Sequence, residues 1–247
     1  QLPGGTVHAM ARDPDGQVWV SVVPGGLFRR PPGTPGFQPV PEFGPNFNPL
    51  RMLASAEGGV WMGLEDGLRR FDGQGKALPV PLTRAGARFD EPVSALAEAP
   101  GGRLWVGSWS GLWQATPATG MRLERVELGD APVSSGGRGS PGVLDLALAR
   151  DGRLWVLAQG RLYRQRSADP RAGFELLLTS EQVPGGLGQQ LIEDAEGVFW
   201  TGRLRFDPRE NRAQVLGPAD GLDVGNQVWA AGSRLPDGRL LFGGSGG

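Results

Sequence analysis

The sequence predicts an all-β protein built from one repeated unit. Three observations support this prediction. The 247 residues include 42 glycines and 22 prolines, which break helix interiors and mark turns. The apolar runs are short and rich in Val, Leu and Trp, as is typical of β-strands. A Gly-x-apolar-Trp motif also returns along the whole chain.

The repeat is anchored on a glycine that precedes a Trp-bearing apolar run. The anchor glycines lie 41–50 residues apart, an interval within the range of known repeat architectures. The last copy has Leu in place of Trp, and the second copy is one residue shorter. The six anchors are Gly16, Gly59, Gly102, Gly152, Gly197 and Gly238.

Each unit contains the signals of four strands in a fixed order. An apolar strand such as the one that starts near Val7 is followed by a tight turn, "DPDGQ" in the first copy and "RDGR" in the fourth. Gly after Asp favours a hairpin because Gly tolerates a positive φ. The Trp-bearing strand comes next, then a Gly-containing turn, a third strand such as residues 27–30 and a weaker fourth strand.

Four antiparallel strands in a unit of about 44 residues make the blade of a β-propeller. The chain then holds about five full blades and part of a sixth, all in one propeller domain of residues 1–247. We predict the units at 1–43, 44–86, 87–136, 137–181, 182–222 and, in part, 223–247.

Most of the tryptophans fall in one column of the repeat. A large aromatic residue that recurs once per blade most simply packs between neighbouring blades. This column consists of Trp19, Trp61, Trp105, Trp155 and Trp200. Trp109 is outside the column, in a predicted turn, where an exposed indole is suited to stacking on a ligand.

Composition excludes several classes of function. The formal net charge of −1, with basic and acidic residues mixed along the chain, gives no basic stripe for nucleic acid. No apolar run reaches the length of a membrane span. Cysteine is absent, which removes disulfides and thiolate metal sites. We expect no cofactor, no metal site and no membrane segment in this chain.

The third repeat, "GGRLWVGSWSGLW" at residues 101–113, resembles the two-component regulator propeller repeat, as do the equivalent stretches of the other copies. This resemblance implies a seven-bladed propeller in the extracytoplasmic, periplasmic part of a bacterial sensor. It also implies neighbouring sensor propellers, a β-sandwich domain and a kinase or cyclase output domain in a longer parent chain. We therefore expect this chain to be the later part of a propeller region, with the missing strands outside it; a six-bladed ring closed with a thin last blade is the alternative.

A ligand site is predicted on one rim of the propeller, where the loops entering the innermost strands share a face. Amide, guanidinium and carboxylate groups beside aromatic rings recognise hydroxyl-rich or anionic small ligands. A glycan fragment or a small anion is the expected ligand, with Arg88 and Arg138 as candidates for gripping an anion. The candidates are Asn46, Asn48, Arg51, Arg88, Asp90, Glu91, Trp109, Arg138, Gln189, Gln190, Asn226 and Gln227.

Catalysis is not predicted for this chain. His8 is the single histidine, and no nucleophile motif accompanies it. The acidic pairs Glu65–Asp66, Asp90–Glu91 and Glu193–Asp194 are sequence neighbours, which point to opposite faces of a strand and make poor catalytic dyads. A propeller lyase or glycosidase is nevertheless one alternative to the sensor interpretation.

The other alternative is a scaffold that binds a protein partner, a second copy of the chain among them. This interpretation expects a large exposed apolar patch on one face. Its first candidates are Phe43, Phe47 and Phe89.

Overall fold

The structure is a computed structural model that describes residues 2–129, 142–169, 171–221, 227–235 and 237–244. The chain divides into two compact units, residues 1–126 and 127–247, and each unit is described by itself. Within the described residues, the only helices are three single turns, η1 (Pro117–Thr119), η2 (Ser180–Gln182) and η3 (Pro218–Asp220). None of these is long and apolar enough to cross a membrane.

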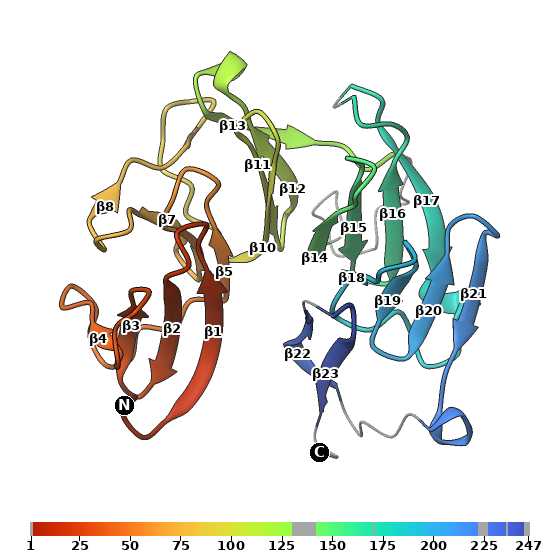
Figure 1. Cartoon of the computed structure of the whole chain (residues 1–247). Helices are drawn as coiled ribbons and strands as arrows, with labels where there is room; N and C mark the ends of the chain where they lie inside the picture. Colours follow the sequence, from red (N-terminus) through yellow and green to blue (C-terminus); the bar gives the residue numbers. More distant parts are fainter. Residues whose placement is uncertain (1, 130–141, 170, 222–226, 236, 245–247) are drawn as a thin grey trace. The chain divides into compact units, whose positions relative to one another are not determined.

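Unit 1 contains three sheets, each built on four consecutive strands that pair antiparallel in sequence order (Figure 1). The first sheet comprises β1 (Thr6–Arg12), β2 (Val18–Val23), β3 (Gly26–Arg30) and β4 (Gln38–Pro39). The second comprises β5 (Arg51–Ala54), β6 (Val60–Leu64), β7 (Gly67–Phe71) and β8 (Ala77–Leu78). The third comprises β10 (Val93–Ala99), β11 (Arg103–Ser108), β12 (Gly111–Ala115) and β13 (Arg122–Val126), and β9 (Leu82–Thr83) pairs in parallel with the outer edge of β13.

Unit 2 continues the pattern with two four-stranded sheets and one two-stranded sheet. Its first sheet comprises β14 (Val143–Leu148), β15 (Leu154–Ala158), β16 (Arg161–Gln165) and β17 (Phe174–Thr179). The next comprises β18 (Ile192–Glu193), β19 (Phe199–Thr201), β20 (Leu204–Asp207) and β21 (Arg212–Val215). The last comprises β22 (Gln227–Arg234) and β23 (Leu240–Gly244). The predicted fold class, with five full blades and part of a sixth, is confirmed.

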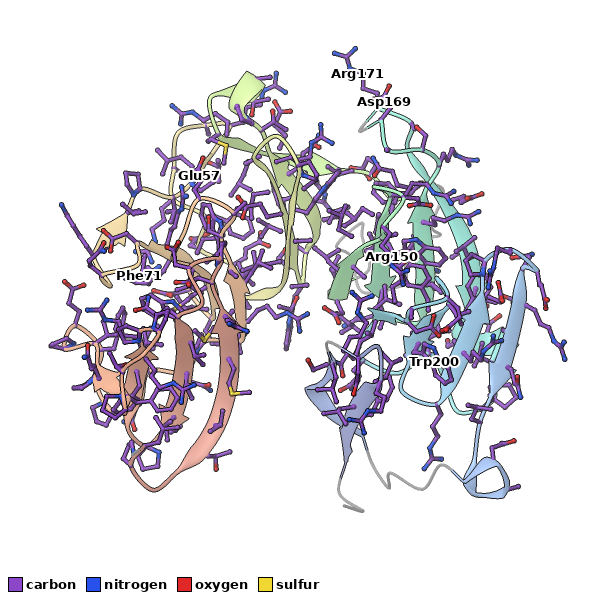
Figure 2. All side chains as sticks on the ribbon, in the orientation of Figure 1. Glu57, Phe71, Arg150, Asp169, Arg171 and Trp200 are labelled. Atoms are coloured by element: carbon purple, nitrogen blue, oxygen red, sulfur yellow. The ribbon has the colours of Figure 1, made fainter. Side chains whose placement is uncertain are left out.

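Within each unit, tryptophans of the column pack against the following sheet, as predicted for Trp19, Trp61 and Trp155. Trp19, Trp61, Trp105 and Trp155 are at most 2% exposed, whereas Trp200 is half-buried. In unit 1 Trp19 joins a cluster with residues of the second sheet such as Met62 and Phe71. In unit 2 Trp155 stacks on Phe199 of the following sheet, with ring centroids 3.7 Å apart. Phe71 and Trp200 are labelled among the side chains of their units in Figure 2.

An arginine lies beside most of these tryptophans on the neighbouring third strand. The cross-strand pairs are Trp19 with Arg29, Trp61 with Arg70, Trp155 with Arg164 and Trp200 with Arg205. The Arg70 guanidinium carbon is 4.7 Å from the Trp61 ring centroid, within cation–π range. The guanidinium of Arg164 lies in the same way 5.5 Å from the Trp155 ring centroid.

The scaffold interpretation predicted an exposed apolar patch formed by three phenylalanines. This prediction is wrong, because none of the three is exposed. Phe89 is 3% exposed and belongs to the core between the second and third sheets. Phe43 and Phe47 are half-buried and pack on the core between the first and second sheets, where the Phe43 and Phe47 centroids are 4.2 Å apart. These loops fold onto the core because removing aromatic surface from water lowers the free energy of the folded chain.

We predict that the stability of unit 2 falls below about pH 4. Hydrogen bonds and charge from Arg209 hold the pKa of Asp207 below its usual range, and hydrogen bonds from Arg239 lower the pKa of Asp237. A carboxylate with a lowered folded-state pKa stabilises the fold above its unfolded-state pKa and loses that contribution as the pH falls through the folded value. The melting temperature from pH 3 to pH 7 measures this effect. Asp207→Asn should flatten its acid limb, and an unchanged profile in that variant would contradict the assignment.

Candidate functional site

The turn between β11 and β12 presents the most exposed tryptophan of the described chain. Trp109 is 66% exposed, in contrast with the buried column. The turn is short because Ser108 pairs with Gly111 across it, which leaves Trp109 and Ser110 as its two central residues. Trp109 therefore stands at the end of a rigid hairpin in unit 1.

Hydrogen bonds from neighbouring polar side chains hold this turn in place. The Ser108 hydroxyl donates to Oε2 of Glu91 at 2.9 Å, and the Ser110 hydroxyl donates to the same oxygen. The indole nitrogen of Trp113 donates to the Ser108 hydroxyl at 3.2 Å. Arg125 donates to the Ser110 carbonyl at 3.0 Å. The turn is thus fixed by residues from the loop before β10 and from three strands of one sheet.

Glu91 is half-buried at the centre of this network. Its Oε2 atom accepts both of the hydroxyl hydrogen bonds that hold the turn. Its other oxygen, Oε1, has no hydrogen-bond partner among the described residues. The arrangement places an acceptor and an exposed aromatic face at the same end of the third sheet.

Arg88 lies at the end of the second sheet, three residues before Glu91. Its guanidinium is 3.2 Å from Oδ2 of Asp66 in the β6–β7 turn, and Arg69 is 2.8 Å from the same oxygen. The close approach depends on Gly67, whose φ is +113° and whose Cβ, if present, would strike the Phe89 carbonyl oxygen. Two cations thus share one carboxylate on the exposed surface of unit 1.

The other candidates of unit 1 are dispersed. Asn46 and Asp90 are exposed, and Arg51 is half-buried at the start of β5. Asn48 is half-buried, and its Oδ1 has no hydrogen-bond partner among the described residues. The structure brings together Arg88 with Asp66 and Glu91 with the Trp109 turn.

In unit 2 the candidates divide between surface and interior. Gln189 is exposed, whereas Gln190 is 3% exposed and donates to the Gly232 carbonyl at 2.9 Å, which ties β22 to the preceding blade. Arg138 and Asn226 lie outside the described residues, as does the side chain of Gln227. The prediction that Arg88 and Arg138 bind an anion together therefore stays a prediction.

Sequence reasoning missed the residues that support Trp109. Ser108, Ser110 and Arg125 have no motif of their own, and their role follows from strand pairing. The one available signal was Ser on both sides of a tryptophan in a Gly-bounded turn, because hydroxyls commonly cap turns. Within the described residues, no cluster of three or more His, Asp or Glu side chains is placed to hold a metal ion.

Comparison with known proteins supports the repeat assignment. Residues 1–22 match the family model of the two component regulator propeller. No curated protein sequence matches the chain. The likeness to solved structures is at low identity and shows the fold.

Three solved structures illustrate this fold. The extracellular domain of a hybrid two component system from B. thetaiotaomicron is 15% identical with a TM-score of 0.55, covering 98% of this chain and 38% of that chain. Virginiamycin B lyase from Staphylococcus aureus is 16% identical with a TM-score of 0.58, covering 85% and 69%. PorZ of the type-IX secretion system of Porphyromonas gingivalis is 20% identical with a TM-score of 0.59, covering 81% and 30%.

This chain spans well under half of the B. thetaiotaomicron and PorZ chains that it matches. The sensor domains and the lyase share the fold and differ in function, so the fold alone assigns neither function. The sheets and the repeat identify the chain as a β-propeller protein, and its residues 1–22 match the two component regulator propeller.

Proposed function

We propose that this chain is a non-catalytic, ligand-binding sensor module of a bacterial signal-transduction receptor, located outside the cytoplasm. The repeat resemblance and the likeness to extracellular domains of two-component receptors support this proposal. Those domains belong to longer chains. The kinase or cyclase output, the β-sandwich neighbour and the periplasmic location are accordingly parts of the proposal.

The observation that carries the proposal is Trp109 on its braced turn. An exposed indole leaves a large apolar face in water. A ligand that covers this face removes it from water, which adds favourable free energy to binding. Ser108, Ser110 and Glu91 already hold the turn, so binding does not have to order it. The ligand class that fits is a hydroxyl-rich ring, such as a sugar of a glycan fragment, stacked on Trp109 with a hydroxyl donating to Glu91.

We expect Trp109→Ala to weaken ligand binding at least tenfold without unfolding the protein. The lost stacking accounts for the tenfold change, about 1.4 kcal/mol. The free energy of unfolding should change by no more than about 0.5 kcal/mol, because the side chain is exposed. The measurement is isothermal titration of the full chain with a panel of oligosaccharides and small anions, backed by the shift in melting temperature.

Two controls make the result specific. Trp109→Phe should retain part of the affinity, since a phenyl ring still stacks. Leu176→Ala, at a 48% exposed position on β17, should bind like the parent chain. A glycan that binds Trp109→Ala as tightly as the parent would overturn the site, and a small anion whose binding depends on Arg88 would move it to the Arg88–Asp66 cluster.

A lyase function has less support. The likeness to virginiamycin B lyase is at 16% identity, which shows the fold alone. His8 lies exposed on β1 and has no described hydrogen bond to a side chain that would orient it as an acid or base. We therefore retain the sensor proposal.

A further inference from the structure

Two exposed arginines of unit 1 meet at one turn, at the outer edge of the third sheet. Arg122 is the first residue of β13 (Figure 1), and it is paired with Leu82 of β9. Arg84 lies two residues after Leu82, at the start of the turn that joins Thr83 to Ala87. Paired residues of neighbouring strands, and residues two apart on one strand, share a face of a sheet. Arg84 and Arg122 therefore lie on the same face of this edge.

Hydrogen bonds across the turn fix its backbone. The Thr83 N–H donates to the Ala87 carbonyl, and the Gly86 N–H donates to the Thr83 carbonyl, each at 2.8 Å. The Ala87 N–H donates to the Thr83 hydroxyl at 3.2 Å. The Ala85 N–H has no acceptor among the described residues. The turn therefore keeps its shape without a ligand and leaves the Ala85 N–H available.

Arg122 reaches over this turn because Gly86 has no side chain. Nη1 of Arg122 lies 3.6 Å from the point that a Cβ of residue 86 would occupy, and Gly86 has a φ of +83°. Any other residue there would contact the guanidinium and hold a strained backbone. The guanidinium of Arg122 is therefore placed over the turn that contains Arg84.

Neither of these two guanidinium groups is neutralised by a direct contact. Arg84 and Arg122 make no ion pair and no side-chain hydrogen bond with any residue that the structure describes. The nearby Arg88 differs, since its guanidinium is 3.2 Å from the Asp66 carboxylate. Glu124, two residues after Arg122 on the same face of β13, is half-buried and makes no ion pair with it. Two cations and one carboxylate leave a positive charge on this face of the edge.

We infer that Arg84, Arg122 and the Ala85 N–H bind a tetrahedral oxyanion, a sulfate or phosphate group. A guanidinium presents parallel N–H donors that match two oxygens of such a group, and the charge strengthens each hydrogen bond. Two guanidinium groups with one backbone N–H supply donors for more than two oxygens, which a carboxylate does not have. The oxyanion is either a free ion or a substituent of a larger molecule, such as a sulfated sugar.

This site is separate from the Trp109 site and does not rest on the proposed sensor function. Leu112, which follows the Trp109 turn, pairs with Val126 at the end of β13, whereas Arg122 begins the strand. Four residues of a strand span about 13 Å. A ligand at one site can therefore be lost without loss of the other.

The test is a two-dimensional nitrogen–proton NMR titration of the full chain with inorganic sulfate, with sodium chloride holding the ionic strength constant. We expect saturable shifts of the Ala85 and Gly86 amide signals, with a dissociation constant in the millimolar range. Inorganic phosphate should shift the same signals. Acetate should bind about tenfold more weakly, because it offers only two oxygens.

A sulfated N-acetylglucosamine and its unsulfated parent distinguish the two sources of the oxyanion. The sulfated sugar should shift the Ala85 and Gly86 signals, and the unsulfated sugar should not. Tighter binding of the sulfated sugar than of inorganic sulfate assigns the site to a substituent, and equal or weaker binding assigns it to the free ion. Shifts of these two signals by the unsulfated sugar would contradict recognition of the oxyanion.

Arg12 supplies a matched control for the two arginines. It is exposed, and its Nη2 lies 3.5 Å from the Cβ position of Gly16, much as Arg122 covers its own turn. The turn at Gly16 contains two aspartates and no second arginine. Arg12→Gln should therefore bind sulfate like the parent, whereas Arg84→Gln and Arg122→Gln should each weaken binding about tenfold. Circular dichroism and the melting temperature confirm that each variant is folded.

Two further results would overturn the inference. In the first, neither sulfate nor phosphate gives a saturable shift of the Ala85 and Gly86 signals. In the second, Arg12→Gln weakens binding as much as Arg122→Gln does, which would mean that anions respond only to the net charge of the protein. Since Trp109→Ala should leave sulfate binding unchanged, failure of the sensor proposal and failure of this inference are distinguishable.

Discussion

We expect Trp155→Ala to lower the free energy of unfolding of unit 2 by about 3–5 kcal/mol, the usual cost of removing a buried tryptophan. Trp155 is 1% exposed and stacks on Phe199, and its ring also meets Phe206 edge-on at 5.9 Å. The substitution removes these contacts and leaves a cavity between two sheets. Arg164, whose guanidinium carbon lies 5.5 Å from the ring centroid, also loses its aromatic partner.

Urea unfolding followed by circular dichroism measures this loss without depending on the removed fluorophore. Trp155→Phe should recover part of the stability, because a smaller ring still stacks on Phe199. Leu176→Ala on the exposed face of β17 should cost little. A Trp155→Ala chain that unfolds at the parent's urea concentration would contradict the packing role of the tryptophan column.

Asp194→Ala is expected to lower the free energy of unfolding by about 2–4 kcal/mol, since it leaves one buried donor and two half-buried donors without an acceptor. Oδ1 of Asp194 accepts from the backbone of Glu196 and of Val198, each at 2.9 Å. Oδ2 accepts from the indole of Trp200 at 2.6 Å. One 8% exposed carboxylate thus closes the β18–β19 hairpin and fixes its tryptophan.

The fourth repeat contains a natural comparison for this variant. Ala149 holds the equivalent position, because its N–H bonds the Arg153 carbonyl as the N–H of Asp194 bonds Val198. Without the carboxylate, Nε1 of Trp155 is buried with no hydrogen-bond partner. Thermal unfolding of Asp194→Ala and Asp194→Asn measures the contribution of the carboxylate to stability. The Asn variant should lose about half as much stability as the Ala variant. Equal stability of the Ala variant and the parent would show that water replaces the carboxylate.

The propeller architecture could be predicted from the sequence because residue patterns within each repeat determine its strands and turns. The anchor glycine, the turn residues and the apolar alternation act within one repeat, and each repeats along the chain. Four of the five tryptophans in the column are buried as predicted. The half-burial of Trp200 and the folding of Phe89 into the core depend on what each sheet meets, which no local pattern contains.

The candidate site was predictable only in part. The exposure of Trp109 follows from its place outside the repeat column, and this was expected from the sequence. Its support by Glu91 and Ser110 joins residues 19 positions apart, through a loop whose path depends on packing. The burial of Gln190 and the pairing of Arg88 with Asp66 likewise depend on approaches between loops that the sequence leaves open.

The sequence by itself determined the strand order within each blade, the repeat length and the buried tryptophan column, because turn chemistry and side-chain alternation are local. Tertiary structure decided which loop residues meet and which carboxylates are paired. These features depend on distances between segments far apart in sequence. The support of the Trp109 turn by Glu91 is therefore apparent only once the sheets are folded.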